Sequence, residues 1–358
     1  MNYIIHLTED CNLNCRYCYE KNKSQDEIPF EYIKRIIDNE SNNVEGYSVI
    51  TFYGGEPLIK KNLIKDTIEY VKTHKTKKKF YYGITTNGIL LDDEFLKYMS
   101  KNNFINVAYS FDGIEEAHNL NRVSHNGEGT YKMVYKNAKK LLKYFKGAVA
   151  MCVITKNNIK YLAESVKHLI DIGFFRINIL FDYSGNWKDE DLTEIKKQCT
   201  DVGQVYYEMM AQEKDILIPL FDEKIKTHIQ TGYNCNNDCN LGIRSVNVGV
   251  DGKYYPCTQF VKNPKYVIGN VKDGIDIEAR AKLLERAHKE IDTCKSCSIN
   301  KRCKHTCACK NYVITNEIDK LSPLVCEIER IVIDVADEVA EELYAIKSKT
   351  FMRKFYTK

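Results

Sequence analysis

The sequence predicts an α/β protein: a partial (β/α)6 barrel with a small C-terminal cluster domain and a closing helix. Residues 1–215 alternate between short apolar runs rich in β-branched residues and amphipathic helical stretches, as repeated βα units do. Nine of the fourteen cysteines lie between Cys235 and Cys326, where long apolar runs are missing. Such a segment needs bound metal for cohesion. A chain of 358 residues that is 44% hydrophobic can bury a full core beside it.

Six apolar runs are predicted to be strands of one sheet, at residues 3–7, 47–53, 80–85, 105–111, 148–154 and 175–181. Helical patterns separate or follow them at residues 30–39, 61–74, 93–100, 131–144, 159–172 and 189–212. Runs that are apolar on both faces predict a parallel sheet covered by helices. Right-handed crossovers would curl six such strands into an open barrel, with the chemistry at the C-terminal ends of the strands.

The second half of the chain has shorter elements. A hairpin is expected at residues 246–250 and 253–255, with its turn at Asp251-Gly252. Apolar residues at helical spacing in residues 324–346 predict a closing helix packed on the barrel. The predicted domains are a barrel, a bridging segment, a cluster domain and a closing helix with its tail, at residues 1–215, 216–234, 235–327 and 328–358.

A compact cysteine array, Cys11-x₃-Cys15-x₂-Cys18, directly follows the first predicted strand. Three thiols at this spacing can hold three irons of a [4Fe–4S] cube and leave the fourth iron open to a small molecule. The alternatives are an incomplete zinc knuckle or three unrelated thiols. Zinc sites favour CxxC pairs and a closed set of four ligands, so the spacing favours an iron–sulfur cluster used in catalysis.

The array, with the aromatic Tyr17 just before its last cysteine, resembles the signature of radical S-adenosylmethionine (SAM) enzymes. The resemblance implies that SAM chelates the open iron through its amino and carboxylate groups. It also implies that reductive cleavage of SAM yields a 5′-deoxyadenosyl radical.

Polar or glycine-rich residues follow the next three predicted strands. Gly54-Gly55-Glu56-Pro57 resembles the motif that receives the SAM amino group in this family, although a Gly-Gly pair alone often marks only a tight turn. Asn87 and Ser110 follow the third and fourth strands and are candidate SAM contacts. The alternative is that they only cap the ends of these strands. The resemblance extends to Arg122, whose guanidinium could pair with the SAM carboxylate. Cys152 and Cys199 are expected to be small core residues.

The second cysteine field has a highly specific spacing. Cys239-x₁₂-Gly252-x₄-Cys257 is followed by Cys294-x₂-Cys297-x₅-Cys303-x₃-Cys307 and then by Cys326. The pattern resembles the SPASM domain of peptide-modifying radical SAM enzymes, with structural zinc as the alternative. The resemblance implies two auxiliary [4Fe–4S] clusters, an outer one on Cys294, Cys297, Cys303 and Cys326 and an inner one on Cys239, Cys257 and Cys307. Cys235 is a candidate fourth inner ligand, and Cys309 is a spare thiol, an alternative ligand or a redox participant.

The resemblance implies a peptide substrate, and one residue bears on the reaction. In the sulfatase-maturing branch an Asp follows the cysteine of the Y-P-C motif and acts as base, whereas here Thr258 follows Cys257. A threonine hydroxyl is a poor base near neutral pH. The leading hypothesis is therefore a peptide maturase that forms a thioether from a cysteine of a ribosomal precursor peptide. The alternatives are an anaerobic sulfatase-maturing enzyme, which makes formylglycine, and an iron–sulfur electron carrier with no chemistry of its own.

Partners and location follow from the same reasoning. The expected partners are the precursor peptide and a reductant such as flavodoxin or ferredoxin. The chain begins almost at its first strand, so a leader-binding domain is not expected and a separate leader-binding protein could supply that function. Fourteen cysteines without an export signal indicate a reducing compartment, the cytoplasm. No apolar run approaches the roughly 20 residues that span a bilayer.

The charge gives no argument for nucleic-acid binding. The formal charge of +4 falls to about −1 if three clusters are bound. The basic segment Lys72–Lys79 is expected to be a solvated loop.

Overall fold

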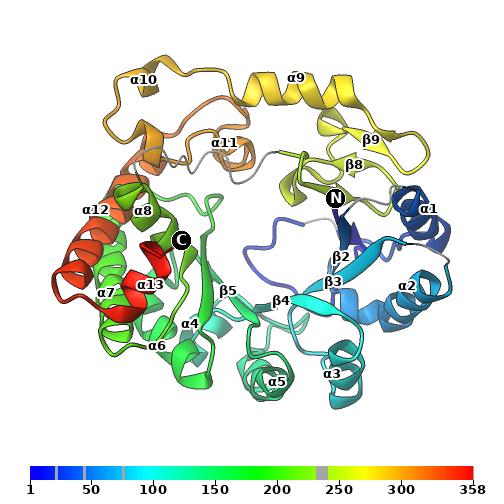
Figure 1. Ribbon diagram of the computed structural model, residues 1–358, viewed down its shortest axis with the longest axis horizontal. Helices are drawn as coiled ribbons and strands as arrows, with labels where there is room; N and C mark the ends of the chain where they lie inside the picture. The colour runs from blue at the N-terminus through cyan, green and yellow to red at the C-terminus, as the bar shows by residue number, and fades with distance from the viewer. Residues whose placement is uncertain (21–22, 43–45, 75–76, 231–240, 358) are drawn as a thin grey trace. The chain divides into compact units, whose positions relative to one another are not determined.

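The structure, a computed structural model, describes residues 1–20, 23–42, 46–74, 77–230 and 241–357 (Figure 1). The chain divides into two compact units. The first unit contains residues 1–110, 122–148 and 240–286, and the second contains residues 111–121, 149–239 and 287–358. The predicted domain boundaries at residues 215, 234 and 327 follow the sequence rather than these contacts, and they stay a prediction.

The first unit is built on a largely parallel sheet with the strand order β4-β3-β2-β1-β7-β8. Its strands are β1 (Asn2–His6), β2 (Tyr47–Tyr53), β3 (Lys79–Thr86), β4 (Phe104–Ser110), β7 (Ser245–Val248) and β8 (Tyr254–Tyr255), with a separate small hairpin of β9 (Gly269–Asn270) and β10 (Gly274–Ile275). Its helices are α1 (Phe30–Ser41), α2 (Lys61–Thr73), α3 (Asp93–Ser100), α5 (Tyr131–Tyr144) and, at the boundary, α9 (Ile277–Ala287). Strand β1 is central because it pairs in parallel with both β2 and β7.

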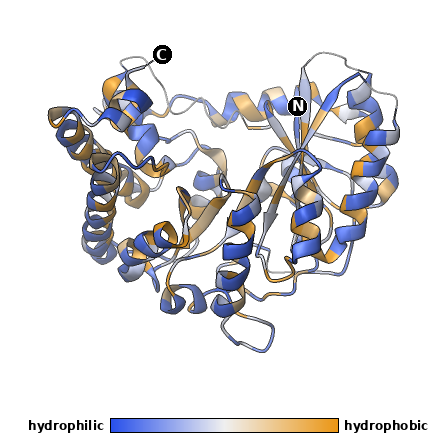
Figure 2. Cartoon of the chain, turned by 60° about the horizontal axis from the view of Figure 1, so that its bottom comes forward, coloured by the Kyte–Doolittle hydropathy of each residue, from blue (hydrophilic) through white to orange (hydrophobic). Residues whose placement is uncertain are grey.

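The two faces of β1 differ in character. Ile5 and its register partners Phe52 and Val248 have no exposed surface. Tyr3, on the same face of β1, donates to Glu40 of α1, so this is the face that helices cover (Figure 1). The buried residues of α1 to α3 are mainly apolar, and the ribbons of these helices carry both hydrophobic and hydrophilic residues (Figure 2). Because side chains alternate along a strand, His6 and Tyr53, which are also in register, point to the opposite, inner face.

The second unit combines two parallel strands with most of the long helices. Strand β5 (Val149–Ile154) pairs with β6 (Arg176–Phe181). The helices are α4 (Glu115–Asn119), α6 (Leu162–Ile172), α7 (Leu192–Ala211), α8 (Pro219–Ile229), α10 (Asp292–Lys295), α11 (Ala308–Thr315), α12 (Pro323–Ala345) and α13 (Lys349–Phe355). The long helix α12 packs on α7 and α8. Cys152 and Cys199 are fully buried, as predicted for core residues.

The predicted fold class is confirmed, and all six predicted strands lie within one residue of their observed ends. Two features differ from the prediction. Helix α8 lies in the segment expected only to bridge two domains, and its Pro219 at the first helical position is a start signal that could have revealed it. The closing helix packs on α7, a helix of the predicted barrel, and on α8, in agreement with the prediction. The predicted hairpin is present, but its first strand, β7, also extends the main sheet.

The basic segment Lys72–Lys79 is not entirely solvated, contrary to the prediction. Lys78 is buried, and its ammonium lies 2.7 Å from the carboxylate of Glu40. The same carboxylate accepts a hydrogen bond from Tyr3 at 2.9 Å. Burial alone would raise the pKa of Glu40, but Lys78, Ser48 and Tyr3 outweigh it and lower the pKa. A run of lysines in the sequence predicts a solvated segment, and only the fold shows that Lys78 is buried in an ion pair with Glu40.

A second buried ion group lies in the second unit. Glu329 on α12 accepts from Lys224 on α8 at 2.7 Å and from Lys310 on α11 at 2.9 Å. All three side chains are at most 10% exposed. Burial alone would raise the pKa of Glu329, but the two ammonium groups outweigh it and lower the pKa to about 2. This group joins α8 to the consecutive helices α11 and α12, and Lys224 and Glu329 are 105 positions apart in the sequence.

Glu329→Gln should therefore lower the free energy of unfolding by about 3–5 kcal/mol, because it leaves two buried ammonium groups without their carboxylate. Urea unfolding followed by circular dichroism measures the change. Glu278→Gln is the matched control, since Glu278 pairs with Lys282 on the exposed surface of α9, where ion pairs contribute little. Equal effects of the two substitutions would contradict the structural role of Glu329.

Candidate active site

The candidate site is the edge of the first unit where the parallel strands β1 to β4 end. The cysteine array follows β1, Gly54 follows β2, Asn87 follows β3, and Ser110 is the last residue of β4. The carboxyl ends of parallel strands meet at one edge of a sheet. The structure therefore brings the sequence-predicted residues of these four strands to the same edge.

The loop that carries the cysteine array is held by the segment that begins at Arg122. The backbone N–H of Asn14 donates to the carbonyl of Val123 at 2.8 Å. The ring nitrogen Nε2 of His125 lies 2.8 Å from the carbonyl oxygen of Cys11. Sequence reasoning missed His125, because its partner is a backbone atom 114 positions away.

The thiols themselves fit a cluster by their chemistry. Cys11 is 7% exposed, and burial raises the pKa of its thiol to about 11. Its sulfur accepts a hydrogen bond from the backbone N–H of Leu13 at 3.4 Å, and the side-chain amide of Asn87 lies 3.9 Å away. Hydrogen bonds to cysteine sulfurs are a feature of iron–sulfur sites.

Among the residues that the structure describes, no three His, Cys, Asp or Glu side chains converge as ligands of a single metal ion would. The ligands of a [4Fe–4S] cube bind separate iron atoms and need no such convergence. Three thiols on one short loop are therefore a suitable donor set for a cluster.

The Gly54-Gly55 pair is required by the protein itself. A Cβ at Gly54 would lie 2.3 Å from the carbonyl oxygen of Thr8, and one at Gly55 would lie 2.2 Å from that of Asp10. The N–H groups of Gly55 and Glu56 donate to these same two carbonyls at 2.9 Å. The glycines thus let the loop after β2 lie directly against the segment that leads into Cys11.

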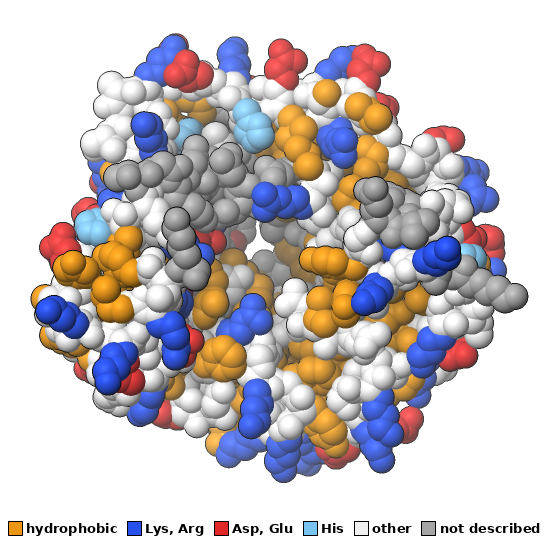
Figure 3. Space-filling model, in the orientation of Figure 1, with side chains coloured by type: hydrophobic (Ala, Val, Ile, Leu, Met, Phe, Trp, Pro, Cys, Tyr) orange, Lys and Arg blue, Asp and Glu red, His pale blue; other side chains and the backbone are white. Residues whose placement is uncertain are grey.

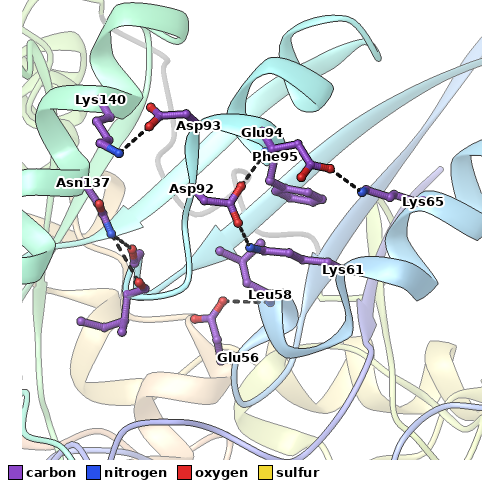
Figure 4. A network of polar contacts seen from close by, with 12 residues as sticks. Glu56, Leu58, Lys61, Lys65, Asp92, Asp93, Glu94, Phe95, Asn137 and Lys140 are labelled. Carbon is purple, nitrogen blue, oxygen red and sulfur yellow. Dashed lines mark hydrogen bonds and ion pairs between the residues drawn. The ribbon is translucent and has the colours of Figure 1, made fainter.

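Glu56 joins the ends of β2 and β3. Its buried carboxylate accepts hydrogen bonds from the N–H of Leu58 (3.0 Å), the hydroxyl of Thr86 (2.7 Å) and the N–H of Asn87 (2.7 Å). Figure 4 shows the carboxylate of Glu56 pointing toward Leu58. Burial raises the pKa of Glu56 to about 7 despite these hydrogen bonds. The carboxylate therefore positions Asn87, a role that the sequence motif alone did not predict.

Glu56→Gln should change the pH dependence of stability. A carboxyl whose pKa rises from 4.5 to about 7 on folding stabilises the fold below pH 4.5, and this contribution is lost as the pH rises through 7. Glutamine does not titrate. We expect the stability of the wild type relative to the variant to be about 1 kcal/mol greater at pH 6 than at pH 8. Urea unfolding at the two pH values measures it, and a difference of opposite sign would contradict the raised pKa.

The remaining predicted SAM-contacting residues are placed as follows. The guanidinium of Arg122 lies over the ring of Tyr17, 5.2 Å from its centre. The side-chain amide of Asn87 donates to Asn12 at 2.9 Å. Pro57 begins the short helical turn after Glu56, and Ser110 is partly buried at the end of β4. Arg122, Tyr17 and Asn87 thus all contact or flank the array.

The second unit brings together the four cysteines predicted to hold the outer auxiliary cluster. Burial, together with the charges of Cys326 and Cys297, raises the pKa of Cys294. Burial also raises the pKa of Cys303 to about 12, with a smaller contribution from Cys326. The side chain of Arg330 donates to the sulfur of Cys297 at 3.4 Å.

The predicted inner set is only partly described. Cys235 and Cys239 lie outside the described residues. In the first unit, the sulfur of Cys257 lies 3.9 Å from the hydroxyl of Thr258. In the second unit, the sulfurs of Cys307 and Cys309 are 3.7 Å apart. Their hydrogen bond, aided by Lys310, lowers the pKa of Cys307 to about 6. This contact keeps Cys309 a candidate ligand.

The surface and the helices add two observations. Acidic and basic side chains are interspersed over the face drawn in Figure 3. Within the described ranges, no helix is both long and apolar enough to cross a membrane.

Comparison with known protein families matches both halves of the chain. Residues 5–169 match the radical SAM superfamily, and residues 239–298 match the SPASM iron–sulfur cluster-binding domain. The chain is therefore a radical SAM enzyme. Within that superfamily, it belongs to the members that carry a SPASM domain. Family membership implies SAM, a SAM-binding [4Fe–4S] cluster and auxiliary iron–sulfur clusters as cofactors.

Individual relatives cover nearly the whole chain. A cysteine-type anaerobic sulfatase-maturating enzyme of Clostridium perfringens is 27% identical in an alignment of 330 positions that covers 83% of this chain and 85% of that protein. The structure is similar to that of native anSMEcpe with bound AdoMet and Kp18Cys peptide, with a TM-score of 0.82 and 23% identity over 96% of this chain and 99% of that one. It is also similar to Streptococcus suis SuiB bound to precursor peptide SuiA, with a TM-score of 0.66 and 18% identity over 91% of this chain and 75% of SuiB.

Proposed function

We propose that this enzyme oxidises a cysteine side chain of a polypeptide substrate to formylglycine, as an anaerobic sulfatase-maturating enzyme. The observation that carries the proposal is the similarity to the cysteine-type enzyme over 83% of this chain and 85% of the relative. By itself, the sequence favours thioether formation, through Thr258, and has this activity as the alternative. The similarity reverses that order, because it extends over both the SAM half and the cluster half of the chain.

Three clusters and SAM would be held by the residues that the sequence singled out. Cys11, Cys15 and Cys18 hold the SAM-binding cluster, and Cys294, Cys297, Cys303 and Cys326 hold the outer auxiliary cluster. The inner auxiliary cluster is held by Cys239, Cys257 and Cys307, completed by Cys235 or Cys309. When bound, these groups supply the 5′-deoxyadenosyl radical and accept the electron that the substrate gives up.

The residues of this chain bind and orient these groups. Arg122, stacked on Tyr17, offers its charge to the SAM carboxylate. Asn87 is fixed by its backbone hydrogen bond to Glu56 and presents its amide beside Cys11. The burial of Cys11 keeps water from that side of the array. The Gly54-Gly55 pair sets the distance between the loop after β2 and the array.

The test is an anaerobic reaction of the iron-loaded enzyme with SAM, a chemical reductant and a sulfatase-type peptide that contains cysteine. We expect 5′-deoxyadenosine and a peptide aldehyde, detected by mass spectrometry and by hydrazone formation. The same peptide with alanine in place of cysteine is the control. Formation of 5′-deoxyadenosine without any aldehyde would contradict the proposal.

Thioether formation in a cysteine-rich precursor peptide is the second candidate. Thr258 favours it, because the sulfatase-maturing branch has an Asp at this position and a threonine hydroxyl cannot replace it as a base. The two reactions differ in their products. A crosslink removes two hydrogens and one alkylatable thiol, whereas formylglycine replaces the sulfur by a carbonyl oxygen. Offering both kinds of peptide in parallel reactions distinguishes them.

The partners would be a polypeptide substrate and a flavodoxin or ferredoxin as electron donor, in the cytoplasm. Solved relatives are bound to peptides, which supports a polypeptide substrate. The spacing of the cysteines, which is that of metal sites rather than of a disulfide framework, supports a reducing compartment.

A further inference from the structure

The proposed reaction needs a group that takes a proton from the substrate, and Thr258 is unsuited to it. A group that replaces Thr258 as the base should be a titratable side chain on the inner face of the sheet. One of its polar atoms should have no hydrogen-bond partner within the protein. The inner face of β1 and its neighbours is the place to look, because the buried apolar side chains of Ile5, Phe52 and Val248 fill the opposite face.

His6 and Glu20 form a buried pair on this inner face. His6 is the last residue of β1, and Glu20 lies two residues beyond the cysteine array. The Nδ1 atom of His6 is 3.6 Å from Oε1 of Glu20, and the two side chains are 3% and 9% exposed. Within the described part of the chain, Nε2 of His6 and Oε2 of Glu20 are buried and have no hydrogen-bond partner.

Two buried polar atoms without a partner are unusual, because buried polar atoms in proteins are nearly always hydrogen-bonded. A third lies nearby in the sheet. Asn247 on β7 is in register with Ile4, two residues before His6 on the adjacent strand. Its side-chain oxygen is also buried without a partner in the described structure. Side chains two positions apart on one face lie about 7 Å from each other. The inner face thus presents a group of polar atoms suited to a ligand.

The ring of His6 packs on a tyrosine that contacts the residue following the cysteine array. This tyrosine is Tyr53, and the centroids of the two rings are 5.0 Å apart. The hydroxyl of Tyr53 accepts from that of Tyr19 at 3.1 Å. Burial raises the pKa of Tyr53 to about 12, and the charges of Glu20, Cys18 and Cys257 contribute to this rise. Tyr53 therefore links His6 to Tyr19, the residue that directly follows Cys18.

We propose that His6 accepts the proton of the reacting substrate residue and that Glu20 positions its ring. The carboxylate favours a proton on the nearer nitrogen, Nδ1, which leaves Nε2 as the acceptor. At 3.6 Å the pair is longer than a hydrogen bond, so the interaction is an electrostatic attraction that orients the ring. The proposal deepens the proposed function and rests on it.

The chemical step balances with the groups already named. The Cβ–H bond of the substrate cysteine breaks and its hydrogen atom joins C5′ of the deoxyadenosyl radical. The thiol proton passes to Nε2 of His6, and one electron passes to an oxidised iron–sulfur cluster, which is reduced. A C=S bond forms, and water then replaces the sulfur to give the aldehyde and hydrogen sulfide.

The experiment separates proton transfer from radical formation. A peptide with deuterium on the cysteine Cβ is incubated with wild type, His6→Gln, Glu20→Gln and His74→Gln. Deuterium in 5′-deoxyadenosine reports hydrogen abstraction, and aldehyde per deoxyadenosine reports the later steps. His74 is the matched control, because its Nδ1 also lies 3.6 Å from a carboxylate, that of Asp38, at the more exposed end of α2.

We expect His6→Gln to keep deuterium transfer and to lower aldehyde per deoxyadenosine about a hundredfold. Glu20→Gln should have a smaller effect and His74→Gln none. Free imidazole should restore aldehyde formation in His6→Ala, which a purely structural role would not allow. An unchanged aldehyde yield in His6→Gln, or no rescue by imidazole, would overturn the role of His6. Absence of aldehyde with the wild type would instead contradict the proposed function.

Discussion

Replacing Cys11, Cys15 and Cys18 together by alanine should abolish reductive cleavage of SAM. All three thiols lie on one loop after β1, and a cluster that loses all three protein ligands is not retained. The iron content should fall by about four atoms per chain. Production of 5′-deoxyadenosine, measured by liquid chromatography under anaerobic conditions, should fall to the level of a reaction without enzyme.

Cys199→Ala is the control for this experiment. Cys199 is a fully buried thiol on α7 and belongs to neither cysteine array. The variant should keep its iron and its SAM cleavage, apart from the cost of a small cavity in the core. Cleavage above background in the triple variant would refute the assignment of the SAM-binding cluster.

Replacing Cys294 and Cys297 by alanine should have a different effect. The pair lies with Cys326 and Cys303 in the second unit, and its loss should remove about four of twelve irons. SAM cleavage should continue, because the array after β1 is untouched. Aldehyde formation should be lost, because the outer auxiliary cluster can then no longer help to accept the electron of the substrate radical.

Metal analysis of the wild type and of the double variant can refute this second prediction. Zinc bound in the protein, or about four irons in total in the wild type, would refute the two auxiliary clusters. Retention of all iron after the double replacement would show that other residues are the ligands of this cluster. Cys309 would then be the first position to examine, because its sulfur is 3.7 Å from that of Cys307.

The strands could be predicted closely because each is a short apolar run bounded by polar residues. Tyr47–Tyr53 is a strand at the very residues predicted. The sheet partner of β1 could not be predicted, because the pairing of Asn2 with Ser245 joins residues that are far apart in the sequence. Lys78 was misjudged for a similar reason, since its partner Glu40 lies 38 positions away in the sequence.

In the candidate site, too, local patterns could be predicted and contacts between distant residues could not. Cysteine spacing is local, so the arrays and the motif from Gly54 to Pro57 were visible in the sequence. The contacts that hold them were not. His125 acts through a backbone carbonyl of Cys11, and the carboxylate of Glu56 is occupied by hydrogen bonds from the end of β3. His6 and Glu20 belong to no motif, and only their burial without partners reveals them.

The parallel pairing of β1 with β7 has a consequence for synthesis of the chain. Strand β1 is made first, but one of its two edges stays open until Ser245–Val248 has been translated. An unpaired central strand is a site for wrong association. A chain ending before residue 245 would keep this edge exposed beside the cysteine loop. The cluster half thus supplies the strand that completes the sheet carrying the SAM half, so a chain cut between the two should be less stable than the whole.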